Sequence, residues 1–469
     1  MSSPESTDKV QLTGDGRDDA VITWDGPTDS NNPQNWTDGR KWLNVILVSI
    51  QGTLSPICST VLALGSQDVA FAFHLHDAYT PALPVALYVL GLGIGPLFLA
   101  PLSEIYGRRI IYLSCFTVFT ILNVGCALAP NIAALSILRL LSGMAGSAGP
   151  SLGGSSIGDM FPRERRGKAQ ALYGFGPTCG PVIGGVIGGF IVSGTGNWRW
   201  LMWVIVIASG VTVLFCLILQ KETYGPFLLR KKLERLRKEN PDRQYRTEFD
   251  VQVKQLLTAF RIYAILYLHL ITITLLFSDR SFYGLFSYHW TGGTVGLAYL
   301  GAGTGSVIGT IICALFLNRS YRYTAARHEK RTGSAVSIPE FRLPFLQVGM
   351  IVTPIGLIIF GWSAEKQLHW AVPLFGALIF GLGMLMGYVC IQTYLVDAFE
   401  EYAASALAAA IVTRCVVSCV FTVVGFQLYR SLGYAWGSML LALLCIAMTP
   451  IPFWLQHYGP KLRSKQFNF

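Results

Sequence analysis

Two arginines lie deep inside long apolar segments, and at that depth an ionised side chain calls for a chemical explanation. Arg139 lies about eight residues, or roughly 12 Å along a helix, into the segment 132–157. Arg414 lies about eleven residues into the segment 403–425. A guanidinium exposed to lipid costs at least about 2.5 to 3.5 kcal/mol, so both side chains should face protein or a wet cavity. For Arg139 the structural alternative is binding to backbone carbonyls of a broken helix.

Groups that could carry a proton across the apolar segments are scarce. His269 lies inside one such segment and is a candidate carrier, although a histidine paired with protein or placed at the interface would look the same in sequence. The carboxylates Asp68, Glu104, Asp159 and Asp397 all fall near segment ends. Two buried arginines without a buried carboxylate would make a central cavity electropositive. The sequence therefore identifies no proton carrier by itself.

Short clusters of opposite charge at the segment ends predict a reversible latch. GPLFLAPLSEIYGRR joins two apolar segments through a turn at Gly107, and Asp159 with RERRGK ends a later segment. Arg108 and Arg109 are expected to meet Glu104 and Asp159. The pattern recurs six segments later, as internal repeats predict, with Arg319 and Arg322 in a basic loop and Asp397 at a segment end. Ordinary flanking charge is the alternative interpretation.

Uncharged polar and aromatic residues within the segments could line a substrate cavity. A polar group at mid-membrane depth needs a partner, whereas aromatic residues are also common in helix packing and at membrane interfaces. The candidates, together with the two arginines Arg139 and Arg414, are Gln51, Tyr173, Tyr267, Tyr299, Tyr388, Gln392 and Tyr394.

No metal, cofactor or catalytic site is expected. The short cluster of His74, His76 and Asp77 lacks a further ligand for a metal ion. The ten cysteines form no CxxC pair, and no Walker sequence or nucleophile with a plausible base is present. The net charge of +10 is distributed over loops, so no nucleic-acid partner is inferred from it. The chain is predicted not to be an enzyme.

The amino-acid composition indicates that membrane-spanning helices position the candidate residues. Of 469 residues, 52% are hydrophobic and only 13% are charged, about half the share usual in soluble domains. Such a chain has too few polar side chains to cover a soluble surface. At about 20 residues for each membrane-spanning helix, the chain has room for twelve. The predicted spans are 42–64, 83–102, 110–129, 132–157, 169–192, 200–219, 256–277, 292–317, 343–362, 369–396, 403–425 and 435–457.

The spans divide the chain into two bundles and assign its sides. We expect a tail over 1–41, a six-helix bundle over 42–219, a charged linker over 220–255, a second bundle over 256–457 and a tail over 458–469. Most of the 36 Lys and Arg residues then fall in the tails and in alternate loops, which predicts that both termini are cytoplasmic. The sequons at Asn35 and Asn318 would lie on that side and carry no glycan. The opposite loops hold only Arg199, Arg280, Lys366 and Arg430.

Glycines in the fifth span give the most specific pattern. Gly176, Gly180, Gly184 and Gly188 recur every fourth residue, which makes a stripe without side chains that allows a neighbouring helix to approach closely. Generic small-residue packing is the alternative. The complete pattern, G-x8-G-x3-GP-x2-GG, is filled by Gly167, Gly176, Gly180, Pro181, Gly184 and Gly185.

This spacing resembles the antiporter motif of drug:proton antiporters in the major facilitator superfamily. PLSEIYGRR is similar to that superfamily's signature between helices 2 and 3 in its fungal form, with Ala100 and Glu104 in place of Gly and Asp. LSILRLLSGMAG resembles the family's fourth-helix motif, with Ser142 where Gln is usual. The resemblance covers roughly 30–255 and 289–457. It implies that the glycine helix seals the interface between the halves, and that Arg139 acts in proton coupling.

The resulting prediction is an all-α polytopic membrane protein with the major facilitator fold. The resemblance implies proton-coupled export of small, mostly apolar organic compounds such as drugs, fungicides or a secondary-metabolite toxin. Arg139, Asp159 and His269 are the proton-coupling candidates. The expected partners are the substrate, protons and lipid, and the expected form is a monomer in the plasma membrane or the vacuolar membrane. A facilitator or importer of a sugar-like nutrient and a non-transporting receptor remain alternatives.

Overall fold

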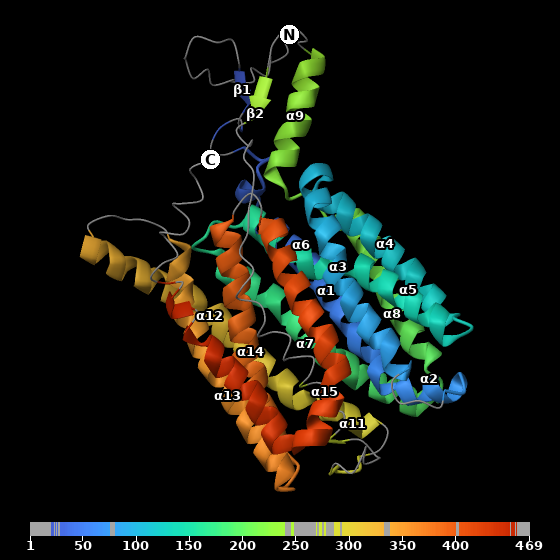
Figure 1. The fold of residues 1–469 in the computed structure, drawn as a ribbon. Coiled ribbons are helices and arrows are strands. Elements are labelled where there is room, and N and C mark those ends of the chain that lie inside the picture. The colour runs from blue at the N-terminus through green and yellow to red at the C-terminus, as the bar shows by residue number, and fades with distance from the viewer. Residues whose placement is uncertain are drawn as a thin grey trace.

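Long helices make up almost all of the architecture that the structure describes (Figure 1). The computed structural model describes residues 20–22, 24, 26, 29–75, 80–239, 245–247, 269, 272–273, 276–277, 286–290, 293–332, 338–399, 403–450, 452–454 and 456. Within these residues, ten helical segments are long and apolar enough to cross a membrane, and Ala403–Val416 is a shorter apolar helix. The predicted seventh span, 256–277, lies mostly outside the described residues.

The first half of the chain forms one helical bundle. Its helices are α1 (Asp38–Leu64), α2 (Ser66–Ala72), α3 (Leu83–Tyr106), α4 (Arg108–Ala127), α5 (Ile132–Gly146), α6 (Ala148–Met160), α7 (Arg166–Thr195) and α8 (Arg199–Leu219). The predicted fourth span is thus two helices, α5 and α6, that meet at Ser147. The short 3-10 helices Pro33–Asn35 and Thr80–Ala82 precede α1 and α3.

The second half of the described chain forms another bundle. It contains α11 (Gly293–Leu297), α12 (Leu300–Thr332), α13 (Leu343–Glu365), α14 (Ala371–Ala398) and α15 (Ala403–Met448), with the 3-10 helix Pro339–Arg342 before α13. Gly433, at φ 72° and ψ 179°, breaks α15 into two helices, near the gap predicted between the last two spans. A left-handed φ of this kind favours glycine.

Two features of the connecting segments differ from the prediction. Helix α12 continues to Thr332, whereas the sequence predicted that this span would end at residue 317. Hydropathy ends there, but the segment that follows contains neither proline nor glycine before Thr332, so the helix continues beyond the apolar stretch. The second difference is a two-stranded parallel pair of β1 (Ala20–Ile22) and β2 (Tyr245–Thr247), beside the linker helix α9 (Gly225–Glu239).

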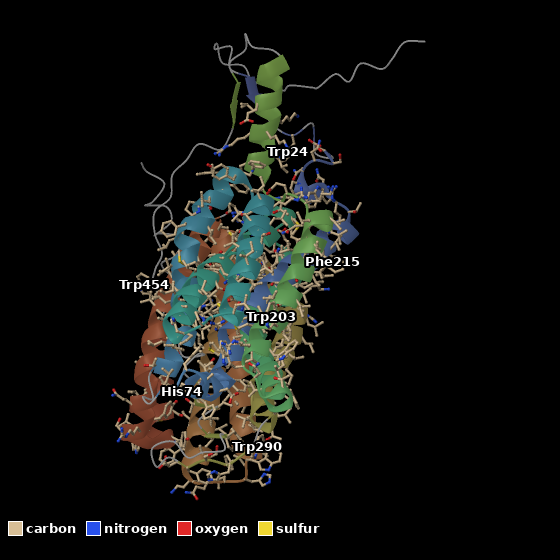
Figure 2. The ribbon with its side chains drawn as sticks, turned by 90° about the vertical axis from the view of Figure 1, so that its right-hand side faces the viewer. Trp24, His74, Trp203, Phe215, Trp290 and Trp454 are labelled. Atoms are coloured by element: carbon tan, nitrogen blue, oxygen red, sulfur yellow. The ribbon has the colours of Figure 1, made fainter. Side chains whose placement is uncertain are left out.

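The hydrophobic core is divided between the two bundles. One cluster contains residues of α1 to α8, and the other is built mainly from the second bundle. Helix α15 belongs to both, because Ala404, Ala408, Ile411 and Cys415 join the first cluster at helical spacing. Figure 2 shows Trp24 near α9 at one end of the molecule, and His74 and Trp290 toward the other.

The glycine stripe of α7 packs against α1 of the same bundle. A Cβ on Gly176 would lie 2.3 Å from Thr53 Oγ1, one on Gly184 would lie 2.5 Å from the Ile57 carbonyl, and one on Gly188 would lie 2.7 Å from the Val61 carbonyl. The stripe itself therefore faces α1 of its own half and not the second half. Other faces of α7 do meet the second half, because a Cβ on Gly185 would touch Tyr299 and one on Gly167 would touch Asn318.

We predict that Gly180→Ala destabilises the protein by about 1 to 3 kcal/mol, the usual cost of overpacking. The new methyl group would lie 2.7 Å from Pro56 Cβ and 2.9 Å from the Thr53 carbonyl, so α1 and α7 must separate. The measurement is the thermal unfolding midpoint of the purified protein. Gly194→Ala is the matched control on the same helix, because nothing lies within 4 Å of its added Cβ. Equal midpoints for the two variants would contradict close packing at Gly180.

Candidate functional site: polar contacts between two bundles

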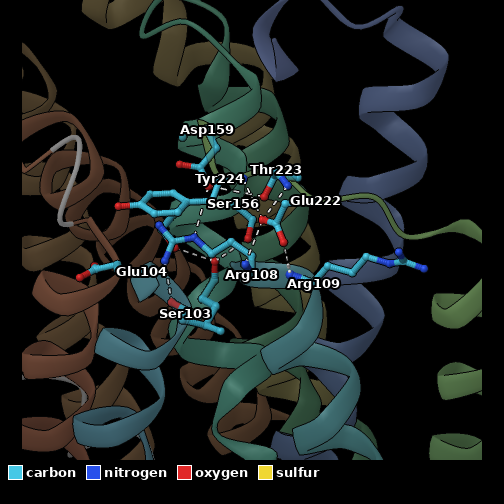
Figure 3. A network of polar contacts seen from close by, with 12 residues as sticks. Ser103, Glu104, Arg108, Arg109, Ser156, Asp159, Glu222, Thr223 and Tyr224 are labelled. Carbon is cyan, nitrogen blue, oxygen red and sulfur yellow. Dashed lines mark hydrogen bonds and ion pairs between the residues drawn. The ribbon is translucent and has the colours of Figure 1, made fainter. Parts of the chain in front are cut away.

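Arg108 is the centre of a polar network at one end of the first bundle (Figure 3). Its Nε donates to Asp159 Oδ2 at 3.3 Å, and its Nη1 donates to Ser103 Oγ at 2.7 Å. The guanidinium lies 4.5 Å from the ring centroid of Tyr224. Burial raises the pKa of the Tyr224 hydroxyl, which lies beyond the end of α8, so the phenol stays neutral beneath the arginine. The predicted contact between Arg108 and Asp159 is thus present.

Glu222 joins this network, although the sequence analysis did not single it out. Its carboxylate accepts from the backbone N–H groups of Arg108 at 2.9 Å, Arg109 at 3.0 Å, Thr223 at 3.0 Å and Tyr224 at 2.9 Å. It therefore caps the N-terminus of α4, where free N–H groups and the helix dipole favour a negative charge. An acidic residue just after the sixth span was the available signal, but its partner lies more than 100 positions earlier in the chain.

Gly107 and Arg109 hold this turn without forming the predicted ion pairs. Gly107 has φ +88°, and a Cβ there would lie 2.5 Å from Glu222 Oε2, so the turn requires glycine. The Arg109 side chain donates to the Leu217 carbonyl at 2.9 Å. No ion pair of Arg109 with Glu104 or Asp159 is present among the described residues.

Glu104 contacts the other half of the protein. Its carboxylate accepts from the backbone N–H of Ser405 at 3.3 Å and from the Ser405 hydroxyl at 3.0 Å. Ser405 lies in the first turn of α15, whose free N–H groups attract an anion. Glu104 was expected to meet Arg108 and Arg109. It attracts Arg108 but forms no ion pair with either arginine among the described residues, and it connects α3 with α15.

Asp397 lies at the centre of a second cluster that joins both halves. It accepts from Arg166 Nη1 at 2.5 Å and from Arg342 Nε at 2.9 Å, and all three side chains are buried. Arg342 Nη2 also donates to the Arg163 carbonyl at 2.6 Å. Two guanidinium groups on one carboxylate leave this cluster with one net positive charge.

The predicted basic partners of Asp397 are incorrect. Arg319 and Arg322 are exposed on the extension of α12 and form no ion pair with Asp397. Their neighbour Asn318 makes the contact instead, because its Oδ1 accepts from the Gly167 N–H at 3.2 Å and from Arg342 Nη1 at 3.4 Å. We call the end of the molecule that holds Arg108, Asp159 and Asp397 the basic end.

Arg139 is fully buried inside the first bundle. Its Nη2 donates to the Cys58 carbonyl at 2.9 Å, its Nη1 to Cys58 Sγ at 3.1 Å and its Nε to the Pro84 carbonyl at 3.4 Å. The guanidinium lies 4.3 Å from the Tyr88 ring centroid. Carbonyls of α1 and α3 thus hold this arginine. The structural alternative expected backbone carbonyls as partners, but it expected them from a broken helix, and α1 and α3 are continuous at Cys58 and Pro84.

His269 packs inside the second bundle, and two of the predicted cavity residues form their hydrogen bonds inside the first. The His269 ring lies 4.6 Å from the centroid of Phe360 and 4.2 Å from that of Phe380, and neither ring nitrogen has a hydrogen-bond partner among the described residues. Gln51 Nε2 donates to Cys216 Sγ at 3.2 Å. Tyr173 donates to the Pro150 carbonyl at 2.7 Å.

Other predicted cavity residues lie where the halves meet. Tyr299 packs on Gly185 of α7, and Tyr388 lies beside Gly174 of the same helix. The Arg414 guanidinium is 5.8 Å from the Tyr388 ring centroid. Gln392 and Tyr394 are buried on α14, whereas Tyr267 lies outside the described residues.

Gln170 completes this interface and was missed by the sequence analysis. It is fully buried on α7, and neither of its amide atoms has a hydrogen-bond partner among the described residues. A Cβ on Gly154 of α6 would lie 3.1 Å from Gln170 Nε2 and 3.2 Å from Gln392 Oε1, so the two amides approach the same point from opposite halves. Gln170 lies close to the start of its predicted span. Polar residues are common at span ends, so its position did not distinguish it in the sequence.

Two bundles of long apolar helices with polar contacts between them at one end have the architecture of a multi-pass membrane protein, and comparison with known proteins identifies a transporter family. The Major Facilitator Superfamily model matches residues 48–422. The chain is 37% identical to the MFS-type transporter atr4 of Stereocaulon alpinum over 99% of this chain and 86% of that protein. It is 36% identical to the efflux pump radE of Floropilus chiversii, over 96% of this chain and 86% of that protein. The chain belongs to the Major Facilitator Superfamily.

Solved structures agree on the fold. The proton:xylose symporter XylE matches with a TM-score of 0.65 at 14% identity, over 88% of this chain and 95% of that one. The human organic anion transporter MFSD10 matches with a TM-score of 0.58 at 16% identity, over 89% and 99%. The predictions of an all-helical polytopic fold and of a transporter rather than an enzyme are confirmed.

We predict that Asp397→Asn loosens the contact between the halves at the basic end. The substitution leaves Arg166 and Arg342 buried together without a carboxylate, and removing one partner of a buried ion pair costs about 3 to 5 kcal/mol. A cysteine introduced by Leu407→Cys, at a fully buried position facing Gly154, should then react with a maleimide at least about tenfold faster. The exposed Asp38→Asn is the control. Unchanged labelling would show that Asp397 does not hold the halves together.

Proposed function

We propose that this protein exports small, mostly apolar organic compounds in exchange for protons by alternating access. The observation that carries the proposal is the set of polar contacts between the halves at the basic end, namely Glu104 with Ser405, Arg166 with Asp397, and Gly167 with Asn318. Each is a hydrogen bond or ion pair that water can replace, so these contacts can break and form again as the halves separate. The efflux-pump relative supports the direction of transport.

The contacts at the basic end serve as the latch of this cycle. They hold that end closed in the present structure, and rocking of the two bundles would open it toward the side that holds both termini. Asp159 pairs with Arg108 inside the first bundle, and Arg108 also attracts Glu104. A proton on Asp159 would leave Arg108 to attract Glu104 away from Ser405, and this would weaken the latch. Protonation and substrate binding then favour opposite states.

Arg139 and His269 are the further coupling candidates. Arg139 supplies a positive charge between α1, α3 and α5, so a proton or a cationic substrate nearby is repelled unless these helices rearrange. His269 would have to leave the rings of Phe360 and Phe380 before it could exchange a proton with water. We also propose a monomer in the plasma membrane or vacuolar membrane with both termini in the cytoplasm.

An efflux panel tests the proposal, with Arg139→Ala as the key variant. We expect cells of a pump-deficient yeast strain that express the protein to accumulate less of at least one dye or fungicide, and an uncoupler to abolish the difference. Arg139→Ala should remain in the membrane and lose at least about tenfold of its pH-driven efflux, equivalent to about 1.4 kcal/mol of coupling. The exposed Arg165→Ala is the control. Unchanged efflux from Arg139→Ala would exclude it from coupling, and net uptake would favour the importer.

The orientation predicts where glycans attach. Asn35 should carry none, whereas Arg199→Thr, which completes a sequon at Asn197 between α7 and α8, should add a glycan that an endoglycosidase removes. The measurement is the gel mobility of protein expressed in yeast. A glycan at Asn35 would place the basic end on the outer side and reverse the proposed direction of the cycle.

A further inference from the structure

Buried amides without partners mark a place where the two halves meet. Gln170 and Gln392 are each at most 1% exposed, and Gln170 Nε2, Gln170 Oε1 and Gln392 Oε1 have no hydrogen-bond partner among the described residues. Leaving buried polar atoms unpaired costs free energy, so most native proteins avoid it. Two of these atoms, Gln170 Nε2 and Gln392 Oε1, meet at one point beside Gly154, which indicates a group that is present only during part of the transport cycle.

The same side of each helix carries an aromatic residue one turn away. Gln170 and Tyr173 are three residues apart on α7, and Tyr388 and Gln392 are four residues apart on α14, so each pair shares a helix face. The Tyr388 hydroxyl lies close to Tyr173, Gln392 and Arg414. The interface thus offers amide donors and acceptors, phenol rings and one guanidinium.

The charges around this interface are mainly positive. Arg414 is 7% exposed and contributes a full positive charge next to Tyr388. Toward the basic end, the cluster of Asp397 with Arg166 and Arg342 carries one further net positive charge. In a medium of low dielectric constant these charges attract anions and repel cations strongly.

We propose that Gln170, Gln392, Tyr388 and Arg414 form the recognition subsite of this exporter, and that it selects neutral or anionic aromatic compounds bearing hydroxyl or carbonyl groups while excluding cations. The amides pair with the oxygen substituents, Tyr388 contacts the ring, and Arg414 attracts an acidic group. This inference rests on the proposed transport function, because it names the substrate class of that function.

Two dyes with one ring system test the charge preference. Fluorescein is an anion and rhodamine 123 a cation, and both contain a xanthene ring. Binding to the full-length protein in phosphatidylcholine nanodiscs is measured by fluorescence anisotropy, with the signal of empty nanodiscs subtracted. We expect the dissociation constant of fluorescein to be at least about tenfold lower than that of rhodamine 123. Equal binding, tighter binding of rhodamine 123, or binding of neither dye overturns the proposal.

Substitutions at the amides test the location. Gln170→Leu and Gln392→Leu should each weaken fluorescein binding by about tenfold. Gln220→Leu is the matched control, since Gln220 is also a buried glutamine with an unpaired amide oxygen but lies at the end of α8. Gln392→Glu should weaken the binding of fluorescein and strengthen the binding of rhodamine 123. Misfolding cannot produce opposite changes of this kind. If the ratio of the two dissociation constants does not move, the subsite is elsewhere.

The binding assay separates this inference from the proposed function. Because it requires no gradient, the expected binding pattern without proton-driven efflux would reject the antiport mechanism and leave the subsite standing. Proton-driven efflux with equal binding of both dyes would reject the subsite and support the antiport mechanism.

Discussion

A guanidinium inside an apolar bundle needs acceptors, and the arrangement of this protein follows from how each buried arginine obtains them. Arg139 uses carbonyls at Cys58 and Pro84, so it ties α5 to α1 and α3. Arg108 uses Asp159 and Ser103 within the first bundle. These contacts stay within one bundle, where they can persist while the halves move.

Arg166 and Arg342 differ because they share one carboxylate. Asp397 lies on α14, Arg342 belongs to the same half, and Arg166 begins α7 of the other half. The ion pair across the interface can therefore break while Asp397 keeps Arg342 as a partner. This division provides a reversible contact that leaves no carboxylate unpaired.

Carboxylates that accept from the first N–H groups of a helix are a second recurring interaction. Glu222 caps α4, and Glu104 accepts from the first turn of α15. Glu365 accepts from the backbone N–H groups of Tyr434 and Ala435, where the chain turns at Gly433. In each case an anion satisfies N–H groups that have no partner within their own helix. Of these three carboxylates, only Glu104 accepts from a helix of the other half. The opening of the basic end must therefore break the contact of Glu104 with α15.

The sequence by itself determined the architecture, because hydropathy and charge act on segments rather than on pairs. Apolar lengths located the spans, with errors where hydropathy and helix formation diverge, as in α12. The motif around Gly107 located the contact of Arg108 with Asp159, whose two elements lie in neighbouring helices. Spacing also predicted that the α7 glycines admit a close neighbour.

Only the tertiary structure decided which helix packs on the glycine stripe and which side chains pair with Asp397. The glycine stripe meets α1 rather than the second half, and Asp397 meets Arg166 and Arg342 rather than Arg319 and Arg322. Gln170 and Gln392 are more than 200 positions apart, and no local pattern relates them. Spacing defines the face of a helix, but the residues opposite that face depend on how the bundles dock, and that is a property of the whole fold.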